Sequence, residues 1–211
     1  MPNHSKYTVA EEIANTTSHG LGVLLSVIAL ITLMAVSIPE GNIIKIASFA
    51  IYGTSLILLF LASTVYHGLS NEKLKQTFKL LDHCAIYILI AGSYTPLMLI
   101  TLKGPLGDGM LVLIWLTAFL GIIFKIKWGH KHKKLSLLTY LGMGFISLAV
   151  INELYQNLTT AGLFLLATGG FIYTLGVFFY VQKKIHFNHA IWHLFVLAGA
   201  GCHFFMILFY L

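Results

Sequence analysis

Two pairs of polar side chains in this sequence have a spacing that could support chemistry. His189 and His193 are four residues apart, and Ser63 and His67 repeat that spacing. On an α-helix, residues four apart lie on one face, one turn above each other. Both pairs fall in strongly apolar segments, where ionisable side chains are costly and by default mark a functional site. The question is therefore what these side chains could do together.

A metal site is the chemistry that His67, His189 and His193 suggest. Three neutral imidazoles can bind Zn²⁺ tetrahedrally and leave the fourth position for water. Zinc lowers the pKa of such a water to about 7, so that it becomes a nucleophile at neutral pH. Asp82 could take a proton from this water or hold the water by a hydrogen bond. Ser63 could orient the water or polarise a substrate carbonyl. We therefore predict metal ligands at the three histidines and catalytic roles for Asp82 and Ser63.

The composition shows which kind of element must position these residues. The chain has 211 residues, is 58% hydrophobic and 9% charged, and has a mean hydropathy of +0.86. A soluble domain carries about a quarter charged residues, and a membrane-spanning helix needs about 20 mostly apolar ones. The sequence therefore predicts an all-α fold, a single domain (1–211) built as a bundle of seven transmembrane helices. The predicted spans are 18–38, 43–67, 80–101, 108–126, 135–152, 160–181 and 188–210.

The lysines predict the orientation of this bundle. The connections after the second, fourth and sixth spans hold ten lysines, whereas those after the first, third and fifth spans hold two. By the positive-inside rule the N-terminus is cytoplasmic and the C-terminus is outside. The lysines lie between apolar segments and form no stripe with aromatic residues, so no nucleic-acid partner is expected. The polar segment 71–79 has spaced apolar positions and is expected to lie along the membrane surface.

This orientation brings polar residues from four spans to one cytoplasmic layer. The second, third and seventh spans deliver the serine, the aspartate and the three histidines described above. The first span begins in the same layer and is preceded by Glu12, with Asn15 and His19 as candidates for contacts behind the metal ligands. Asp82 is the only acid that the sequence places inside this layer.

Other interpretations of the same residues remain open. Polar side chains in membrane bundles often only hydrogen-bond across helices, each bond contributing about 0.6 kcal/mol. Chains of histidine and aspartate also line proton relays and cation pathways. The convergence of three histidines, an aspartate and a serine at one depth favours the metal. His83 and His203 are interpreted as packing residues, and Cys84 and Cys202 lie at different depths, so no disulfide is expected.

The combined motifs resemble those of a known family. They are Glu12-x-x-Asn15-x-x-Ser18-His19-Gly20, Ser63-x-x-Tyr66-His67, Asp82-His83-x-x-Ile86-Tyr87 and His189-Ala190-x-Trp192-His193. Together they resemble the hemolysin III family, the bacterial branch of the progestin and adipoQ receptor (PAQR) family, over essentially the whole chain. The resemblance implies a multi-pass protein of the cell membrane, in a bacterium the plasma membrane.

The resemblance also implies a function. It places a zinc site at the cytoplasmic side of a seven-helix fold, with His67, His189 and His193 as ligands and with Asp82 and Ser63 around the zinc-bound water. Some relatives look like ceramidases, so the expected reaction is metal-dependent hydrolysis of an amide or ester bond in a membrane lipid. The alternatives are a pore-forming cytolysin, as the family name suggests, and a non-enzymatic receptor or regulator of membrane lipid state. The oligomeric state and the identity of the lipid are not predicted.

Overall fold

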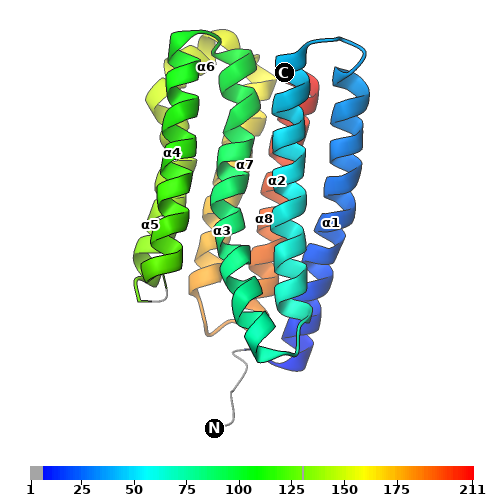
Figure 1. Ribbon diagram of the computed structural model, residues 1–211, viewed down its shortest axis with the longest axis vertical. Coiled ribbons are helices and arrows are strands. Elements are labelled where there is room, and N and C mark those ends of the chain that lie inside the picture. Colours follow the sequence, from blue (N-terminus) through cyan, green and yellow to red (C-terminus); the bar gives the residue numbers. More distant parts are fainter. Residues whose placement is uncertain (1–6, 130) are drawn as a thin grey trace.

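The computed structural model describes residues 7–129 and 131–211, and within those ranges it contains helices but no strand. Seven helical segments are long and apolar enough to cross a membrane, which confirms the predicted all-α membrane fold. They run side by side along the long axis of the molecule, and α1 starts at the end opposite to the C-terminus (Figure 1). The helices are α1 (Val9–Ser37), α2 (Ile43–Gly68), α3 (Glu72–Pro96), η1 (Leu97–Thr101), α4 (Pro105–Trp128), α5 (Lys133–Gly144), η2 (Ile146–Val150), α6 (Ile151–Asn157), α7 (Thr160–Val181) and α8 (Asn188–Tyr210).

Helix α1 begins at Val9, well before the predicted boundary at residue 18. Thr8 caps it, because its hydroxyl accepts a hydrogen bond from the Glu11 N–H (3.2 Å) while the Glu11 carboxylate accepts one from the Thr8 N–H (2.8 Å). Such a capping box satisfies backbone donors that a helix otherwise leaves unpaired at its start. The polar first turns of α1 are thus part of the spanning helix and not a segment that precedes it.

Residues 71–79, which the sequence places along the membrane surface, form the start of helix α3. Asn71 caps α3 by accepting hydrogen bonds from the N–H groups of Lys73 and Leu74, and α3 then runs without a break from Glu72 to Pro96. The spaced apolar positions of this segment belong to the first turns of a long helix, and its place at the membrane surface stays a prediction.

The fifth span is interrupted, and it ends at Asn157 rather than at residue 152. It consists of α5, the short 3-10 helix η2 and α6. Backbone polar groups need partners inside a membrane. The hydroxyl of Tyr94 on α3 is the hydrogen-bond partner of two such groups at the interruption. It donates to the Gly144 carbonyl (2.8 Å) and accepts from the Ser147 N–H (2.9 Å). The break is therefore held in place by the neighbouring helix.

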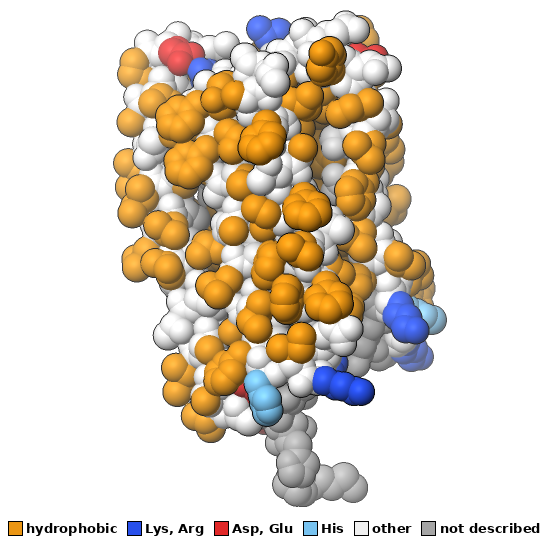
Figure 2. Space-filling view, turned by 180° about the vertical axis from the view of Figure 1, so that it is seen from behind, with side chains coloured by type: hydrophobic (Ala, Val, Ile, Leu, Met, Phe, Trp, Pro, Cys, Tyr) orange, Lys and Arg blue, Asp and Glu red, His pale blue; other side chains and the backbone are white. Residues whose placement is uncertain are grey.

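The bundle packs as neighbouring pairs, with α1 against α2, α2 against α3, α7 against α8, and α8 against α1. Small residues allow neighbouring helices to approach each other closely. At Gly92 on α3, a Cβ atom would meet the Ser55 hydroxyl of α2 at 2.3 Å. The outer surface is largely hydrophobic along its length, and the charged side chains gather towards the ends (Figure 2). The chain is accordingly an integral, multi-pass membrane protein.

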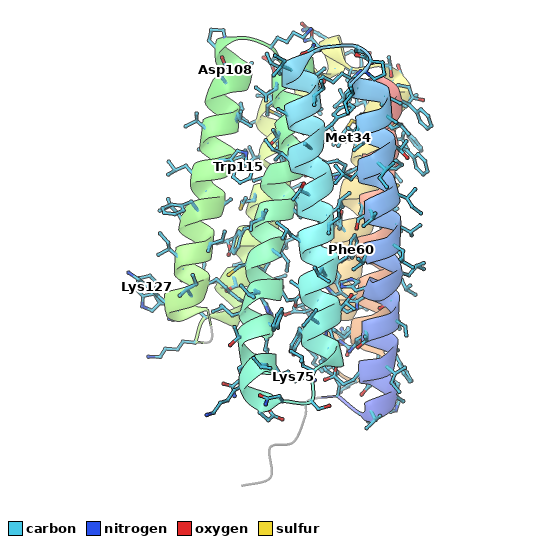
Figure 3. The ribbon with its side chains drawn as sticks, turned by 45° about the vertical axis from the view of Figure 1, so that its right-hand side comes forward. Met34, Phe60, Lys75, Asp108, Trp115 and Lys127 are labelled. Carbon is cyan, nitrogen blue, oxygen red and sulfur yellow. The ribbon has the colours of Figure 1, made fainter. Side chains whose placement is uncertain are left out.

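The lysine-rich connections share one end of the bundle. Lys75 and Lys127 lie at the end where α1 begins, and Asp108 lies at the opposite end (Figure 3). This arrangement matches the alternation that the sequence predicts. Which end faces the cytoplasm stays a prediction from the positive-inside rule.

Candidate metal centre

Three histidines meet at the end of the bundle where α1 begins. His67 belongs to the last turn of α2, and His189 and His193 occupy the first two turns of α8. One ring nitrogen of each lies within 4.8 Å of the others, so the three side chains could hold a metal ion. His67 and His193 are buried, each about 2% exposed, and His189 is partly buried. The two helices thus bring together residues more than a hundred positions apart in the sequence.

The distance between two of these nitrogens fits zinc. Zinc–nitrogen distances of about 2.0–2.1 Å in a tetrahedral site put neighbouring ligand nitrogens about 3.3 Å apart. The Nε2 atoms of His67 and His189 are 3.2 Å apart. All three ligands are imidazoles, which suit Zn²⁺ and leave a fourth coordination position for another group.

The outward-facing nitrogens of two of these rings are already engaged. His67 Nδ1 lies 2.6 Å from a carboxylate oxygen of Glu12. Because a carboxylate only accepts, His67 Nδ1 carries the proton and its Nε2 lone pair faces the cluster. His193 Nδ1 lies 3.2 Å from the carbonyl oxygen of Asn15 and 3.0 Å from the hydroxyl of Ser18. It therefore also donates outward, and the other nitrogen of both rings keeps the lone pair that a metal ligand needs.

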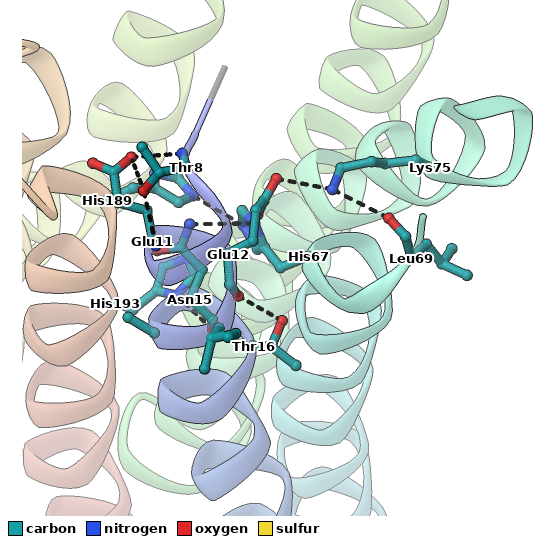
Figure 4. Close-up of polar contacts among 12 residues, drawn as sticks. Thr8, Glu11, Glu12, Asn15, Thr16, His67, Leu69, Lys75, His189 and His193 are labelled. Atoms are coloured by element: carbon teal, nitrogen blue, oxygen red, sulfur yellow. Dashed lines mark hydrogen bonds and ion pairs between the residues drawn. The ribbon is translucent and has the colours of Figure 1, made fainter. Parts of the chain in front are cut away.

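Helix α1 provides these outer contacts although none of the three clustered histidines belongs to it. Glu12, Asn15, Ser18 and His19 follow one another at helical spacing, so they share the face of α1 that looks towards α2 and α8 (Figure 4). The His19 ring stacks on His193, with centroids 3.5 Å apart and 14° between the planes. The structure thus brings both positions predicted behind the ligands, Asn15 and His19, into contact with them.

Three buried polar atoms of helix α1 have no hydrogen-bond partner among the described residues. They are the two ring nitrogens of His19 and the side-chain oxygen of Asn15. Buried orphan groups are rare and often indicate a water or ligand that supplies the missing bonds. Polar atoms thus remain available around the three histidines for a substrate or for water.

Asp82 and Ser63 do not belong to the group of three histidines. Asp82, in the third turn of α3, is buried, but its carboxylate does not come within 4.8 Å of all three ring nitrogens. The Ser63 hydroxyl is close enough to interact with this carboxylate, and Lys79 and Lys125 are the nearby cations. The arrangement is compatible with the predicted role of Asp82 next to the metal and not as its ligand.

Several residues in contact with the cluster, among them Glu12, Ser18 and Tyr7, are missing from the sequence prediction as partners of the histidines. Glu12 appears there only as a residue that precedes the first span, although its carboxylate touches His67. The Tyr7 ring stacks on His189, with centroids 5.2 Å apart, and burial raises the pKa of its phenol, so that it stays neutral. The Thr-x-x-Glu capping signal at Thr8 could have extended the helix far enough to reveal Glu12. No local pattern indicates the stacking of Tyr7.

The remaining predicted packing residues lie away from the cluster. His83 Nδ1 donates a hydrogen bond to the carbonyl oxygen of Lys79 on its own helix. His203 lies against the Leu166 carbonyl of α7 at 3.4 Å. Cys84 and Cys202 are both free.

Comparison with known proteins agrees with this architecture. A family model described as haemolysin-III related matches residues 7–204. The chain is 48% identical to Hemolysin-3 of Bacillus cereus over 202 residues, which cover 96% of this chain and 92% of that protein. It is 47% identical to the Hemolysin-3 homolog of Bacillus subtilis (strain 168) over 204 residues, covering 97% and 96% of the two chains.

A human protein is similar as well. The monocyte to macrophage differentiation factor of Homo sapiens is 36% identical over 218 aligned positions, covering 100% of this chain and 89% of that protein. The similarity therefore extends over the full set of helices that build the three-histidine cluster. With a family model that matches nearly its whole length and relatives at almost half identity, this chain belongs to the haemolysin-III-related family.

Proposed function

We propose that this protein is a zinc-dependent hydrolase that cleaves an amide or ester bond in a membrane lipid. The observation that carries the proposal is the set of three histidine nitrogens within 4.8 Å, two of whose rings are locked with a lone pair facing inward. A closed four-ligand zinc site is structural, whereas three protein ligands are typical of a catalytic one. His67, His189 and His193 would hold the metal.

The groups around the ligands support catalysis. Bound zinc supplies a Lewis acid and lowers the pKa of water. The Asp82 carboxylate takes the proton of the attacking water and passes it to the leaving amine or alcohol, as a general base and then acid. The Ser63 hydroxyl, buried beside Asp82, donates a hydrogen bond to the substrate carbonyl or orients the water. The apolar bundle around them admits a substrate that arrives from the lipid.

Metal content tests the first part of the proposal. Purified protein is expected to contain about one zinc per chain by elemental analysis, and His189→Ala or His193→Ala should remove it, because three ligands are needed to hold the ion. Cys202→Ala, on the same helix but outside the cluster, is the control and should keep the metal. Unchanged zinc in both histidine variants would show that the cluster only packs the helices.

Turnover tests the second part. Asp82→Asn should retain zinc, because Asp82 is not a ligand, and should lower hydrolysis of a panel of lipid amides and esters by about 10²-fold or more. Equal rates in Asp82→Asn and wild type would refute the proposed role of Asp82. If the wild type binds zinc but hydrolyses no lipid on the panel, a receptor or regulator of membrane lipid state becomes the better interpretation.

Cytolysis is the second candidate function, because the similar protein of Bacillus cereus is named Hemolysin-3. A pore-forming protein should release a trapped dye from lipid vesicles when added from outside. This release should be unchanged in His67→Ala and His193→Ala if it is independent of the metal site. Purified wild-type protein that releases no dye would exclude this candidate.

A further inference from the structure

A chain of two short ionic contacts connects His67 to the turn between α2 and α3. The Glu12 carboxylate on α1 uses one oxygen for His67 Nδ1 (2.6 Å) and the other for the Lys75 ammonium (2.8 Å). Lys75, in the first turn of α3, also donates to the Leu69 carbonyl at the end of α2 (3.2 Å). Three different helices thus meet at one carboxylate (Figure 4).

The contact between Glu12 and His67 sets the orientation and the tautomer of the His67 ring. The ring could rotate about its Cβ–Cγ bond and could carry its proton on either nitrogen. The carboxylate of Glu12 selects the tautomer with the proton on Nδ1 and holds the ring plane, so that Nε2 stays 3.2 Å from Nε2 of His189. Hydrogen bonds of this kind raise the basicity of a ligand histidine and orient it.

Lys75 in turn restricts the position of the Glu12 carboxylate. A glutamate with one occupied oxygen could rotate away from the ring or could itself compete as a ligand. Lys75 occupies the second oxygen, and the two side chains are only 17% and 15% exposed, so the pair is well shielded from solvent. The pair therefore keeps the carboxylate in place and balances its charge close to the metal site.

A cleft gives water access to this pair. His67, Glu12 and Lys75 line a cleft of about 440 Å³ between the first turns of α1 and the α2–α3 turn, together with Val9 and Ile13. A water that entered this cleft could replace the carboxylate as a partner of His67 Nδ1 but would hold the ring less firmly. Loss of Glu12 should thus weaken metal binding without abolishing it.

We propose that Glu12 is a positioning residue that sets the metal affinity of the three-histidine site through His67, and that Lys75 holds Glu12 in place. The inference rests on the proposed metal site and goes beyond it by assigning the source of its affinity. Partners of this kind typically change metal affinity by about 10- to 100-fold when they are removed.

The test compares double variants in which no unpaired charge is left behind. Glu12→Leu with Lys75→Met replaces the ion pair by apolar side chains of similar size, a change that is often neutral for stability. Glu12→Gln with Lys75→Met also removes both charges, but its amide oxygen can still accept the hydrogen bond from His67. Glu40→Gln with Lys45→Met is the matched control, since it removes an ion pair of 2.9 Å at the other end of the bundle.

Two quantities are measured on purified full-length protein: the Kd for Zn²⁺ by competition with a chelator, and the unfolding temperature of the metal-free form. Glu12→Leu with Lys75→Met should bind zinc about 10- to 100-fold more weakly than the wild type, with an unfolding temperature close to that of the wild type. Glu12→Gln with Lys75→Met should bind zinc almost as tightly as the wild type. The control, Glu40→Gln with Lys45→Met, should leave the Kd for zinc unchanged. Lys75→Met alone should weaken binding by a smaller factor, because the carboxylate stays but loses its anchor.

Failure of this inference can be told apart from failure of the metal site. A wild type that binds no zinc refutes the metal site itself. If the wild type and Glu12→Leu with Lys75→Met bind zinc with the same Kd, the metal site is supported and the positioning role of Glu12 is refuted. An equal loss of zinc affinity in the double variants with Glu12→Leu and with Glu12→Gln would also refute that role, because the hydrogen bond to His67 would then have no effect.

Discussion

The carboxylate of Glu11 on α1 accepts a hydrogen bond from the backbone N–H of Phe187, 3.2 Å away, immediately before α8. The same carboxylate caps α1 through Thr8. Phe187 has a φ of 56°, in the left-handed region that bulky residues rarely adopt, and no side chain caps α8. Glu11 thus joins the starts of two helices, one of which carries His189 and His193.

The first prediction concerns this contact. Glu11→Ala should lower the free energy of unfolding by about 1–2 kcal/mol, because it removes the capping box and the partner of the Phe187 N–H. Glu11→Gln retains an acceptor and should lose less. Unfolding temperature and hydrogen exchange at the start of α8 are the measurements. Unchanged exchange in Glu11→Ala would mean that the contact does not hold this turn.

The second prediction uses two adjacent glycines on α7. A Cβ atom at Gly169 would lie 2.4 Å from the His203 ring of α8, whereas one at Gly170 would meet nothing within 4 Å. Gly169→Ala should therefore destabilise the protein by about 1–3 kcal/mol through overpacking. Gly170→Ala should be neutral or stabilise by up to about 1 kcal/mol through helix propensity. Equal unfolding temperatures for the two variants would contradict the close packing of α7 on α8.

The third prediction concerns the orientation in the membrane. The connections around Lys103 and Lys131 lie at opposite ends of the bundle, after the third and fourth spans. Reporter fusions at these residues should therefore report opposite sides, with Lys131 on the cytoplasmic side, because lysine-rich loops stay inside. Two fusions that report the same side would refute the topology, and a cytoplasmic Lys103 would reverse it.

The sequence by itself determined the class of fold and the residues worth testing. Hydropathy and segment length are local properties, so seven spans can be predicted without knowledge of how they pack. Helical spacing is equally local, and it places His189 above His193 and Ser63 above His67 on their helix faces. The fifth span was predicted too short, because its interruption depends on Tyr94 of another helix.

Only the tertiary structure decided how these residues meet. The contact between Glu12 and His67 joins residues 55 positions apart, and that between Ser18 and His193 joins residues 175 apart. Such pairs depend on the register and rotation of packed helices, which no periodicity within one helix specifies. The same packing leaves Asp82 outside the group of three nitrogens, and it brings side chains of α1 into contact with His67 and His193. The candidate ligands could thus be predicted from local patterns, whereas the groups that hold them follow from the packing of α1 against α2 and α8.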